Sequence, residues 1–547
     1  MIQLTHNTIA QLCIAASQKY GGRLAFALFR ENKICPESRV TYRMMGIRAL
    51  QIGLILRQLG VASGDRVLLF SENCPAWPLS YFGIALAGAV SVPLLTGFSP
   101  DQVRHIADHA EVTAIITSRA MAAKTEQLPP SIPKIFIDSM TSQEITVLCE
   151  GGEKILALPV LGSNPELPVC KPDDLAAIIY TSGTSGTSKG VMLSHENIIF
   201  SAFSSLSMVK LRPYDRLISV LPLAHAYECS LGMLGPVISG SSINYLDRPP
   251  SASVLLPAAK AIRPTVMATV PVFIEKMYNN AIAPALERSK LYRSILTRPL
   301  VTWIAGRKLG RALGGRIRYF AIGGAPLVPE VEKFLRCVRF PYVIGYGLTE
   351  AAPLVAGTSS PRFPFRSAGT APLGVELRIA AADEDSAQKN IGEIQLRGPN
   401  VMMGYYCNEE QTREAFTDDG WLRTGDLGSM DSKGQLYICG RIKSLILGPG
   451  GENIYPEEIE GLLGSSQLIE EALVYSGEKG ELVALVRLSD AAKAAASALE
   501  HILEELKAWA NKKLARFSRL SRIEVQHEPF EKTPTMKIKR YLYPRLT

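Results

Sequence analysis

Residues 180–190 read Tyr180-Thr-Ser-Gly-Thr-Ser-Gly-Thr-Ser-Lys189-Gly190, the most informative run in the chain. Glycines at 183, 186 and 190 let backbone N–H groups converge on a polyanion, since glycine has no Cβ atom in the way. The hydroxyls can donate to phosphate oxygens and Lys189 adds charge, although the order of residues excludes a Walker A loop. A flexible Ser/Gly linker is the alternative, but the run follows an apolar strand pattern and precedes a helical pattern opened by Ser194. We therefore expect a phosphate-binding loop between a strand and a helix.

Short apolar runs alternate with helical patterns on both sides of this loop. The expected buried strands are Arg66–Phe70, Thr113–Thr117, Lys134–Ile137, Ala176–Tyr180 and Leu217–Leu221, and the expected helices are Pro75–Ala89 and Glu196–Met208. Such alternation is typical of mostly parallel sheets covered by helices. The sequence therefore predicts an α/β protein whose large N-terminal domain covers residues 1–440.

The pattern changes near residue 440. Strand patterns at Ala472–Tyr475 and Leu482–Leu488, with a long amphipathic helix from about Ala491 to Leu514, predict a small α+β domain over residues 441–547. A length of 547 residues exceeds what one hydrophobic core normally serves, which supports a division into two domains.

Cysteine usage and apolar runs bear on the cellular compartment. The nine cysteines stand singly, without a C-x-x-C pair, as expected of reduced thiols. The N-terminus lacks the basic start and apolar run of a signal peptide. The apolar run Tyr81–Phe98 is about long enough to span a membrane, but it contains three glycines and Pro93. We expect a buried helix followed by a buried strand there, and a cytoplasmic protein.

The chain carries 59 Lys and Arg against 51 Asp and Glu, a net charge of +8. The last 41 residues hold 11 basic and 3 acidic residues, a surplus of eight. A second block, Arg288–Arg318, has nine basic residues, no acidic one and interleaved apolar residues that include Trp303. Such a block suits peripheral contact with the inner face of an anionic membrane, and the alternative is a solvated helix face. Neither block carries a nucleic-acid motif, so we expect no nucleic-acid partner.

Further motifs follow the glycine-rich loop in a familiar order. They are Leu221-Pro-Leu-Ala-His225, Ile322-Gly-Gly-Ala-Pro326, Gly345-Tyr-Gly-Leu-Thr-Glu350, Gly392-Glu-Ile-Gln-Leu-Arg-Gly398 with Gly404-Tyr-Tyr, Trp421-Leu-Arg-Thr-Gly-Asp426, Gly440-Arg-Ile-Lys443, Gly450-Gly-Glu-Asn-Ile-Tyr-Pro456 and Thr535-Met-Lys-Ile-Lys-Arg540. Together they resemble the adenylate-forming superfamily of acyl-CoA synthetases, luciferases and peptide-synthetase adenylation domains. The resemblance covers nearly the whole chain, and the helical span Val270–Arg318 is most like long-chain fatty-acid–CoA ligases.

The resemblance implies a role for each motif. It places ATP at Thr181, Ser182, Gly183, Thr184, Ser185, Gly186, Thr187, Lys189, Gly324, Ala325, Pro326, Tyr346, Gly347, Asp426 and Arg441. It makes Lys537, Thr349, Glu350 and His225 catalytic, with Glu350 as the Mg²⁺ ligand. It assigns Lys443, Gly450, Gly451 and Glu452 to the region that meets the thiol acceptor, and Ser444 to the hinge of a small mobile domain.

These roles also make physical sense, although each residue has a plainer interpretation. Glu350 can hold Mg²⁺ with few other protein ligands, but it could instead cap a helix or pair with an arginine. Asp426 suits ribose hydroxyls, but it could cap a turn. Lys537 can neutralise the α-phosphate, but it lies in a basic tail. His225 alone would more often be a core histidine. His105 and His109 lack the intervening Glu of a zinc motif, and we expect them on a helix surface.

Four positions depart from the family pattern. Ser188 replaces a proline of the phosphate loop, Ser444 stands where Asp or Lys is usual at the hinge, Pro449 replaces a serine, and Met536 replaces a glycine. None of these changes removes a charged catalytic group, so we expect an active enzyme.

The resemblance implies ATP-dependent activation of a fatty acid to acyl-AMP, with release of pyrophosphate and transfer of the acyl group to coenzyme A. ATP, Mg²⁺ and coenzyme A are therefore the expected cofactor and substrates. Acyl carrier protein as the acceptor remains an alternative, because a cationic surface suits either acceptor. A catalytically silent lipid-binding scaffold is a further alternative, which the presence of Lys189, Glu350, Asp426 and Lys537 disfavours.

Overall fold

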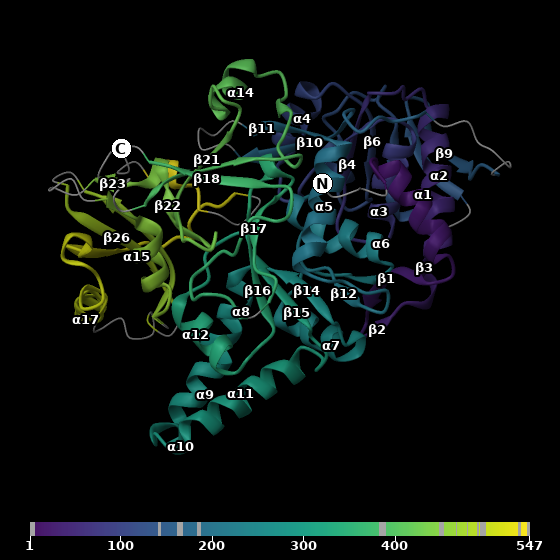
Figure 1. The fold of residues 1–547 in the computed structure, drawn as a ribbon. Helices are drawn as coiled ribbons and strands as arrows, with labels where there is room; N and C mark the ends of the chain where they lie inside the picture. Colours follow the sequence, from purple (N-terminus) through teal and green to yellow (C-terminus); the bar gives the residue numbers. More distant parts are fainter. Residues whose placement is uncertain are drawn as a thin grey trace.

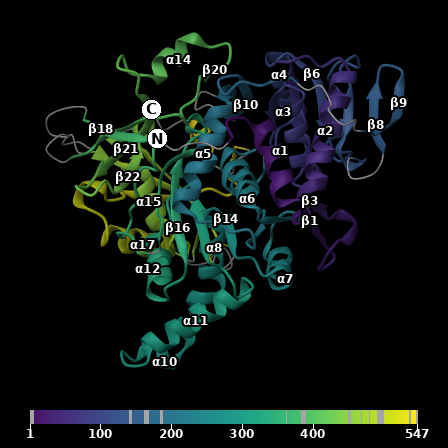
Figure 2. The ribbon, with the colours of Figure 1, turned by 45° about the vertical axis from the view of Figure 1, so that its right-hand side comes forward.

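The fold is described from a computed structural model. It describes residues 6–139, 144–160, 168–182, 188–360, 362–381, 390–447, 453–466, 468–477, 480–489, 492, 499–533 and 538–543. Figures 1 and 2 show its arrangement from two directions.

The first large sheet has a parallel centre and antiparallel edges. Its strands follow the order β17 (Leu354–Gly357), β16 (Tyr342–Gly347), β15 (Tyr319–Gly323), β14 (Val266–Thr269), β12 (Arg216–Ile218), β13 (Ser242–Leu246), β1 (Leu24–Arg30) and β2 (Lys33–Ile34), with β3 (Val40–Thr41) beside β1. The six strands from β16 to β1 run parallel. Their carboxyl ends therefore share one edge of the sheet, where ligands bind in open α/β folds.

The second large sheet has the same character. Its order is β20 (Gly404–Tyr405), β11 (Ser188–Ser194), β10 (Leu175–Ser182), β5 (Val90–Pro93), β4 (Arg66–Phe70), β6 (Val112–Thr117), β7 (Lys134–Phe136), β8 (Glu144–Cys149) and β9 (Gly152–Ala157). The run from β10 to β7 is parallel. This confirms an α/β fold with largely parallel sheet centres.

Helices fill the space between and around the sheets. Helix α5 (His195–Met208) contacts β10 and β11 of one sheet and β17 of the other, so it lies between them (Figure 1). Its N-cap Ser194 forms a capping box with Asn197, which fixes where the helix begins. Helix α3 (Ala76–Leu86) is buried along its whole length and leads into β5, which confirms the helix–strand interpretation of the apolar run. Among the described residues, no helix has both the length and the apolar content needed to cross a membrane.

Two smaller parts complete the chain. A four-stranded antiparallel sheet joins β18 (Glu376–Ala380), β19 (Gly392–Arg397), β21 (Leu422–Met430) and β22 (Leu436–Arg441). The C-terminal part has α15 (Pro456–Leu463), α17 (Leu499–Asn511) and a sheet of β25 (Ile469–Ser476), β26 (Leu482–Leu488) and β27 (Arg522–Val525), around its own apolar core. A small α+β unit is therefore present, as predicted.

Three predicted elements differ from the structure. The glycine-rich loop does not join a strand directly to a helix, because β11 intervenes and pairs antiparallel with β10. This strand satisfies its backbone on both sides, with β10 and with β20. The strand expected at Leu217–Leu221 ends at Ile218. The long C-terminal helix is described only as α17, since residues 493–498 lie outside the described residues.

A helical arm projects from the large domain. It comprises α9 (Ala283–Arg288), α10 (Lys290–Arg293) and α11 (Arg298–Ala312), at the bottom of Figures 1 and 2. Gly306 anchors α11, because a Cβ atom there would lie 2.4 Å from the Cβ atom of Val338. The buried face of α11 thus points to the body and its other faces point outward.

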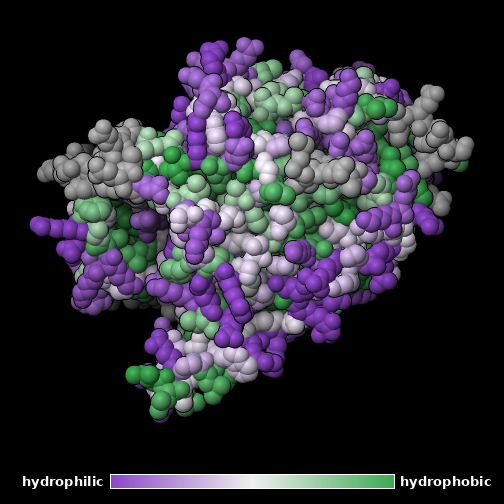
Figure 3. Space-filling view, viewed as in Figure 1, coloured by the Kyte–Doolittle hydropathy of each residue, from purple (hydrophilic) through white to green (hydrophobic). Residues whose placement is uncertain are grey.

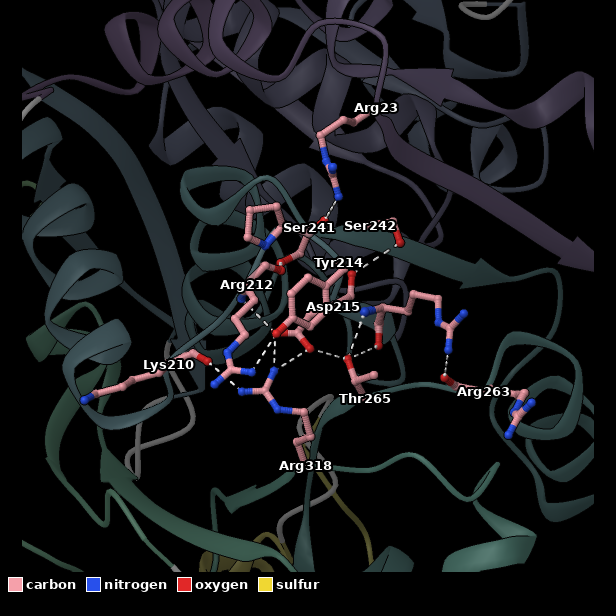
Figure 4. Close-up of polar contacts among 12 residues, drawn as sticks. Arg23, Lys210, Arg212, Tyr214, Asp215, Ser241, Ser242, Arg263, Thr265 and Arg318 are labelled. Carbon is pink, nitrogen blue, oxygen red and sulfur yellow. Dashed lines mark hydrogen bonds and ion pairs between the residues drawn. The ribbon is translucent and has the colours of Figure 1, made fainter.

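Asp215 ties together the amino ends of several strands of the first sheet (Figure 4). Both its oxygens lie 2.7 Å from Nη1 of Arg318, and it also accepts from the Thr265 hydroxyl and the Arg212 backbone N–H, each at 2.7 Å. Its side chain is fully buried. The buried carboxylate is thus completely hydrogen-bonded, which its burial requires.

Replacing Asp215 by Ala should lower the unfolding free energy of the large domain by about 3 kcal/mol, since removing one partner of a buried ion pair leaves the other uncompensated. Chemical denaturation followed by circular dichroism measures this loss. Asp418→Ala, at an exposed aspartate, is the control and should change the free energy little. A loss below about 1 kcal/mol for Asp215→Ala would contradict the anchoring role.

Candidate active site

Lys189 lies near the start of β11, which pairs with β10 in the second sheet. Lys189 faces Thr181 across the hairpin, and β20 pairs with the other side of β11. This pairing brings Tyr405 alongside, with its ring centroid 5.0 Å from Lys189 Nζ. The lysine ammonium thus lies within cation–π range of an aromatic ring.

Glu350 lies on the other side of Tyr405. It belongs to the short 3-10 turn Thr349–Ala351 that follows β16, and its carboxylate Oε1 accepts a hydrogen bond of 3.0 Å from the Tyr405 hydroxyl. The backbone is held as well, because the N–H of Met402 donates to the carbonyl of Glu350 at 2.9 Å. Burial, followed by the Glu350 charge, raises the pKa of Tyr405, so its hydroxyl remains a donor. Glu350 is half-buried and held by a tyrosine, in a short 3-10 turn and not a long helix, and within the described part of the chain it forms no ion pair with an arginine.

Asp426 is the second anchored carboxylate. It lies in β21 opposite Arg441 of β22, whose Nε is 3.0 Å from Oδ1 of Asp426. Oδ2 accepts a 2.6 Å hydrogen bond from the hydroxyl of Tyr346 at the end of β16. The pKa of this tyrosine is raised by burial and then by the aspartate charge. Asp426 thus sits within a strand at 6% exposure, and the turn-cap interpretation is wrong.

Two further segments lie near Tyr346 and Asp426. Gly347 follows Tyr346, and a Cβ atom there would lie 2.0 Å from the carbonyl oxygen of Pro353, so only glycine fits. Residues 324–326, which are Gly324, Ala325 and Pro326, form an exposed turn after β15, the next strand of the sheet. Thr349 is half-buried beside Glu350. The residues predicted to bind the nucleotide lie in or just after β15, β16, β21 and β22. The hydrogen bond between Tyr346 and Asp426 brings the four-stranded sheet to the edge where the parallel strands of the first sheet end.

His225 belongs to the segment that follows β12. Its Nδ1 accepts from the backbone N–H of Tyr227 at 3.2 Å, and Tyr227 donates from its hydroxyl to the carbonyl of Ala321 at 3.1 Å. Tyr227 lines a narrow, largely apolar pocket of about 40 Å³ together with Leu231, Gly345 and Leu354. The pocket thus lies next to Tyr346, between the histidine segment and the nucleotide residues.

Several predicted residues cannot be placed. Gly183, Thr184, Ser185, Gly186, Thr187, Gly450, Gly451, Glu452 and Lys537 lie outside the described residues. Ser182 ends β10, and Lys443 is exposed after β22. The hydroxyl of Ser444 donates to the carbonyl of Arg441 at 3.3 Å and also bonds the carboxylate of Glu457.

Sequence reasoning missed the residues that position these groups. Tyr405 belongs to the Gly404-Tyr-Tyr motif, but the motif predicts no function for it. No sequence pattern indicates Asn400, whose side-chain amide donates to the carbonyls of Ala351 and Leu354 at 3.1 and 2.8 Å. Glu228 was also missed. It is buried, burial raises its pKa to about 8, and it accepts a 2.6 Å hydrogen bond from Ser219. The only sequence signal for Glu228 is its position as an acidic residue close to the apolar motif Leu221–His225.

The two histidines of α4 (Pro100–His109) do not form a metal site in the described part of the chain. His105 is exposed, whereas Nδ1 of His109 lies 2.7 Å from the hydroxyl of Tyr180, just before the glycine-rich loop. No cluster of three or more His, Cys, Asp and Glu side chains that could hold a metal ion occurs among the described residues.

Two family profiles cover most of the chain. The AMP-binding enzyme profile matches residues 15–406, and the profile of the AMP-binding enzyme C-terminal domain matches residues 444–543. An open α/β fold thus coincides with a family match to more than half of the sequence. The chain belongs to the AMP-binding enzyme family.

Curated relatives and solved structures agree with this assignment. The chain is 31% identical to the peroxisomal long chain acyl-CoA synthetase 6 of Arabidopsis thaliana, over 82% of this chain and 68% of that protein. It is 32% identical to the long-chain-fatty-acid–CoA ligase FadD15 of Mycobacterium bovis, over 81% and 76%. The fold matches o-succinylbenzoate CoA synthetase from Bacillus subtilis in complex with an acyl-adenylate intermediate, with a TM-score of 0.75, 24% identity and 97% coverage of both chains. It also matches ATP-bound MatB from Rhodopseudomonas palustris, with a TM-score of 0.73, 23% identity and 98% coverage of both chains.

Proposed function

We propose that this protein activates a long-chain fatty acid with ATP and then transfers the acyl group to coenzyme A. The observation that carries the proposal is the pair of anchored carboxylates, Glu350 and Asp426, at the edge formed by the carboxyl ends of the strands. The similarity to long-chain acyl-CoA synthetases over more than four-fifths of the chain supports the substrate class.

In the first half-reaction, a fatty-acid carboxylate oxygen attacks the α-phosphorus of ATP. A phosphorus–oxygen bond forms, the bond to the β-phosphate oxygen breaks, and pyrophosphate leaves with that electron pair. Because an anion approaches a polyanion, neutralisation of charge dominates this step. Lys189 supplies one positive charge, and the hydroxyl of Thr349 can donate to the α-phosphate.

Glu350 suits a magnesium ligand. Tyr405 bonds its Oε1, so the second carboxylate oxygen can bind the ion, which commonly uses one or two carboxylates together with substrate phosphates. Mg²⁺, when bound there, would neutralise phosphate charge.

Asp426 and Tyr346 suit the nucleoside. A carboxylate accepts hydrogen bonds from both ribose hydroxyls, and the tyrosine ring offers an apolar face to adenine. The hydrogen bond between them orients the two groups as one unit, and Arg441 fixes the other carboxylate oxygen. We assign the turn at residues 324–326 to the same nucleoside.

In the second half-reaction, the coenzyme A sulfur attacks the acyl carbonyl carbon, and AMP leaves with the electron pair of the broken carbon–oxygen bond. We assign residues 1–440 to substrate binding and 441–547 to a mobile domain that brings Lys537 to adenylation. Reorientation at Ser444 would then present Lys443 and residues 450–452 to the thiol, as a gate on turnover. The separate profile match to residues 444–543 supports this division.

The apolar pocket beside Tyr346 is our candidate for the acyl chain, with His225 near the carboxylate. Its volume of about 40 Å³ is far below that of an ordinary ligand site, about 300–1,000 Å³. Acyl entry therefore requires movement of flexible lining side chains such as Met208, Leu231 and Leu354. Methionine and leucine can change rotamer without breaking a hydrogen bond, which makes such opening inexpensive.

Pyrophosphate release, screened over acids from acetate to stearate with and without coenzyme A, tests this function. We expect release to be greatest with long-chain acids and acyl-CoA to form only when coenzyme A is present. Lys537→Ala is the control, and it should lose acid-dependent release at least 100-fold, as is common when a charge that stabilises the transition state is removed. Thioester formation only with acyl carrier protein would overturn the acceptor, and no release with any acid would overturn the activity.

Tyr405→Phe should raise the Mg²⁺ concentration needed for half-maximal pyrophosphate release about ten-fold, because a group that orients a metal ligand typically contributes 10–100-fold. Tyr406→Phe is the matched control, since the neighbouring Tyr406 packs its ring against His109 and not Glu350. Circular dichroism verifies folding of both variants. Equal Mg²⁺ dependence in both would refute a positioning role for Tyr405.

We also propose that the protein is cytoplasmic and that the helical arm attaches it to the inner face of an anionic membrane. The nine reduced cysteines support the compartment. The apolar end of the arm supports the attachment. Its exposed apolar side chains are Leu291, Ile295, Leu296, Leu300, Trp303 and Ile304, with Ile295 and Leu296 exposed by 88% and 91%. Figure 3 shows them as a hydrophobic tip.

Basic side chains lie along the same arm, from Arg288 to Arg311. Arg288, Lys290, Arg293, Arg298, Arg307, Lys308 and Arg311 are all exposed. The guanidinium of Arg307 lies 4.8 Å from the Trp303 ring, and that of Arg298 lies 4.9 Å from the Tyr292 ring. Apolar and aromatic groups beside cations are what the boundary between acyl chains and anionic headgroups accommodates. A helix face that only contacts solvent would not explain why the aliphatic side chains of Ile295 and Leu296 are almost fully exposed.

Ile295→Glu with Leu296→Glu should weaken binding to phosphatidylglycerol-containing vesicles at least ten-fold, since burying one such side chain contributes about 1.5–3 kcal/mol. Co-sedimentation measures binding, and the tryptophan emission, to which Trp303 contributes together with three other tryptophans, should shift to the blue only with vesicles. Val160→Glu with Val169→Glu is the matched control, because these residues are 97% and 89% exposed on another part of the chain. Charge reversal at Arg307, Lys308 and Arg311 should weaken binding to anionic vesicles, and unchanged binding in both arm variants would refute the attachment.

A further inference from the structure

A second group of cations gathers at the opposite edge of the first sheet, where its parallel strands begin. Strands β1, β13, β12, β14 and β15 are neighbours in the sheet, and the residues at or just before their first positions meet here. The candidate active site occupies the other edge, beyond the carboxyl ends of the strands. A five-residue strand such as β15 spans about 16 Å, so the two edges are distinct surfaces.

We name this group the arginine patch. It comprises Arg23, Lys210, Arg212, Arg263 and Arg318, which Figure 4 labels, together with Arg216 and Arg316. The segments that supply them, 21–26, 210–218, 240–245, 263–266 and 314–320, contain one acidic residue, Asp215. Seven cations less one carboxylate leave a surplus of +6. Asp215 is already saturated by Arg318, Thr265 and a backbone N–H, and so offers little to the other six cations.

Backbone carbonyls hold several of these side chains in place. Arg23 donates to the carbonyls of Pro213 and Gly240, the latter at 3.4 Å. Nη2 of Arg216 donates to the carbonyl of Arg263 at 2.9 Å, which links two members of the patch. Carbonyl oxygens orient a guanidinium without neutralising it. The patch is therefore pre-organised as well as charged, which reduces the entropy lost when an anion binds.

Like charges also approach one another within the patch. The pKa of Arg216 is lowered, first by burial and then by the charges of Arg316 and Arg263. Five members, Arg23, Lys210, Arg212, Arg263 and Arg316, are exposed and can reach a ligand. Holding cations together without a counter-charge costs free energy, and a multivalent anion would relieve that repulsion.

We propose that the arginine patch binds the phosphate groups of an extended polyanion, as a site separate from catalysis. Five neighbouring strands spaced about 4.8 Å apart span about 19 Å, which exceeds one phosphate and suits several. A pocket of about 290 Å³ gives one of these phosphates a recess; it is lined by Arg23, Leu24, Pro213, Tyr214, Ser242 and Asp215, whose charge is already paired with Arg318. Guanidinium groups favour phosphate because their forked N–H groups match its oxygens. Soluble polyphosphates and the headgroups of a phospholipid surface share this chemistry.

Charge reversal of three exposed members, Arg212→Glu, Arg263→Glu and Arg316→Glu in one chain, tests the proposal. The probes are inorganic tripolyphosphate, measured by calorimetry, and phosphatidylglycerol vesicles, measured by co-sedimentation. A non-hydrolysable acyl-adenylate analogue, which carries no polyphosphate, occupies the catalytic site throughout these binding measurements, and Mg²⁺ is left out. We expect at least ten-fold weaker binding of one probe, while acid-dependent pyrophosphate release remains unchanged. The matched control is Arg57→Glu, Lys154→Glu and Lys433→Glu, at exposed cations outside the patch.

Each outcome is decisive. Loss of tripolyphosphate binding assigns the site to a soluble polyphosphate, and loss of vesicle binding alone assigns it to lipid headgroups. The vesicle arm is repeated in the Ile295→Glu, Leu296→Glu background, which removes the contribution of the helical arm. The milder Arg212→Gln, Arg263→Gln, Arg316→Gln variant replaces the first if its melting temperature falls. Equal binding by the patch and control variants, or no binding of either probe by the unaltered chain, would overturn the proposal. Because pyrophosphate release is measured separately, failure of the proposed activity would be distinguishable.

Discussion

The carboxyl end of β16 is where three sheets meet, and two hydrogen bonds between tyrosines and carboxylates form that junction. Tyr346 and Glu350 lie within five residues of each other at this end. Tyr346 reaches β21 through Asp426 at 2.6 Å, and Glu350 reaches β20 through Tyr405 at 3.0 Å. Strand β20 belongs to the second large sheet and β21 to the four-stranded sheet. A shift of the second large sheet would therefore disturb Glu350, a shift of the four-stranded sheet would disturb Asp426, and a shift of β16 would disturb both.

The choice of tyrosine at this junction has an electrostatic consequence. A hydroxyl orients a carboxylate without cancelling its charge, whereas an arginine would compete with a metal ion for it. Oε1 of Glu350 accepts a hydrogen bond from a tyrosine hydroxyl, which brings no positive charge that would compete with a cation. Asp426 is paired with Arg441 as well, which suits a group that accepts hydrogen bonds from neutral hydroxyls. The two carboxylates thus have different surroundings that match different proposed tasks.

Local sequence patterns predicted several of the strands and helices, and motif order predicted the family. Strand β4 matches its predicted bounds, and α3 followed by β5 matches the interpretation of the apolar run. The failures arise where a residue's partner is distant in sequence. Strand β11 is an exception in part, because it pairs with the preceding β10, although its other partner, β20, lies more than 200 residues later. Tyr405 contacts a residue 55 positions away, and Tyr346 one 80 positions away. Hydrophobic periodicity carries no information about such pairs.

The basic block at 288–318 also shows that sequence alone does not predict which charged residues come together in the fold. As sequence it is one uniform stretch, yet the fold divides it, because α10 and α11 form the projecting arm while Arg316 and Arg318 lie just before β15, at the edge of the sheet. There they join arginines from distant segments, which no window of sequence could reveal. Helix α11 has 15 residues and so is about 22 Å long. That length exceeds the screening distance of about 8 Å at physiological salt. The tip of the arm and the arginine patch therefore interact little with each other through charge, and each must find its own anionic partner.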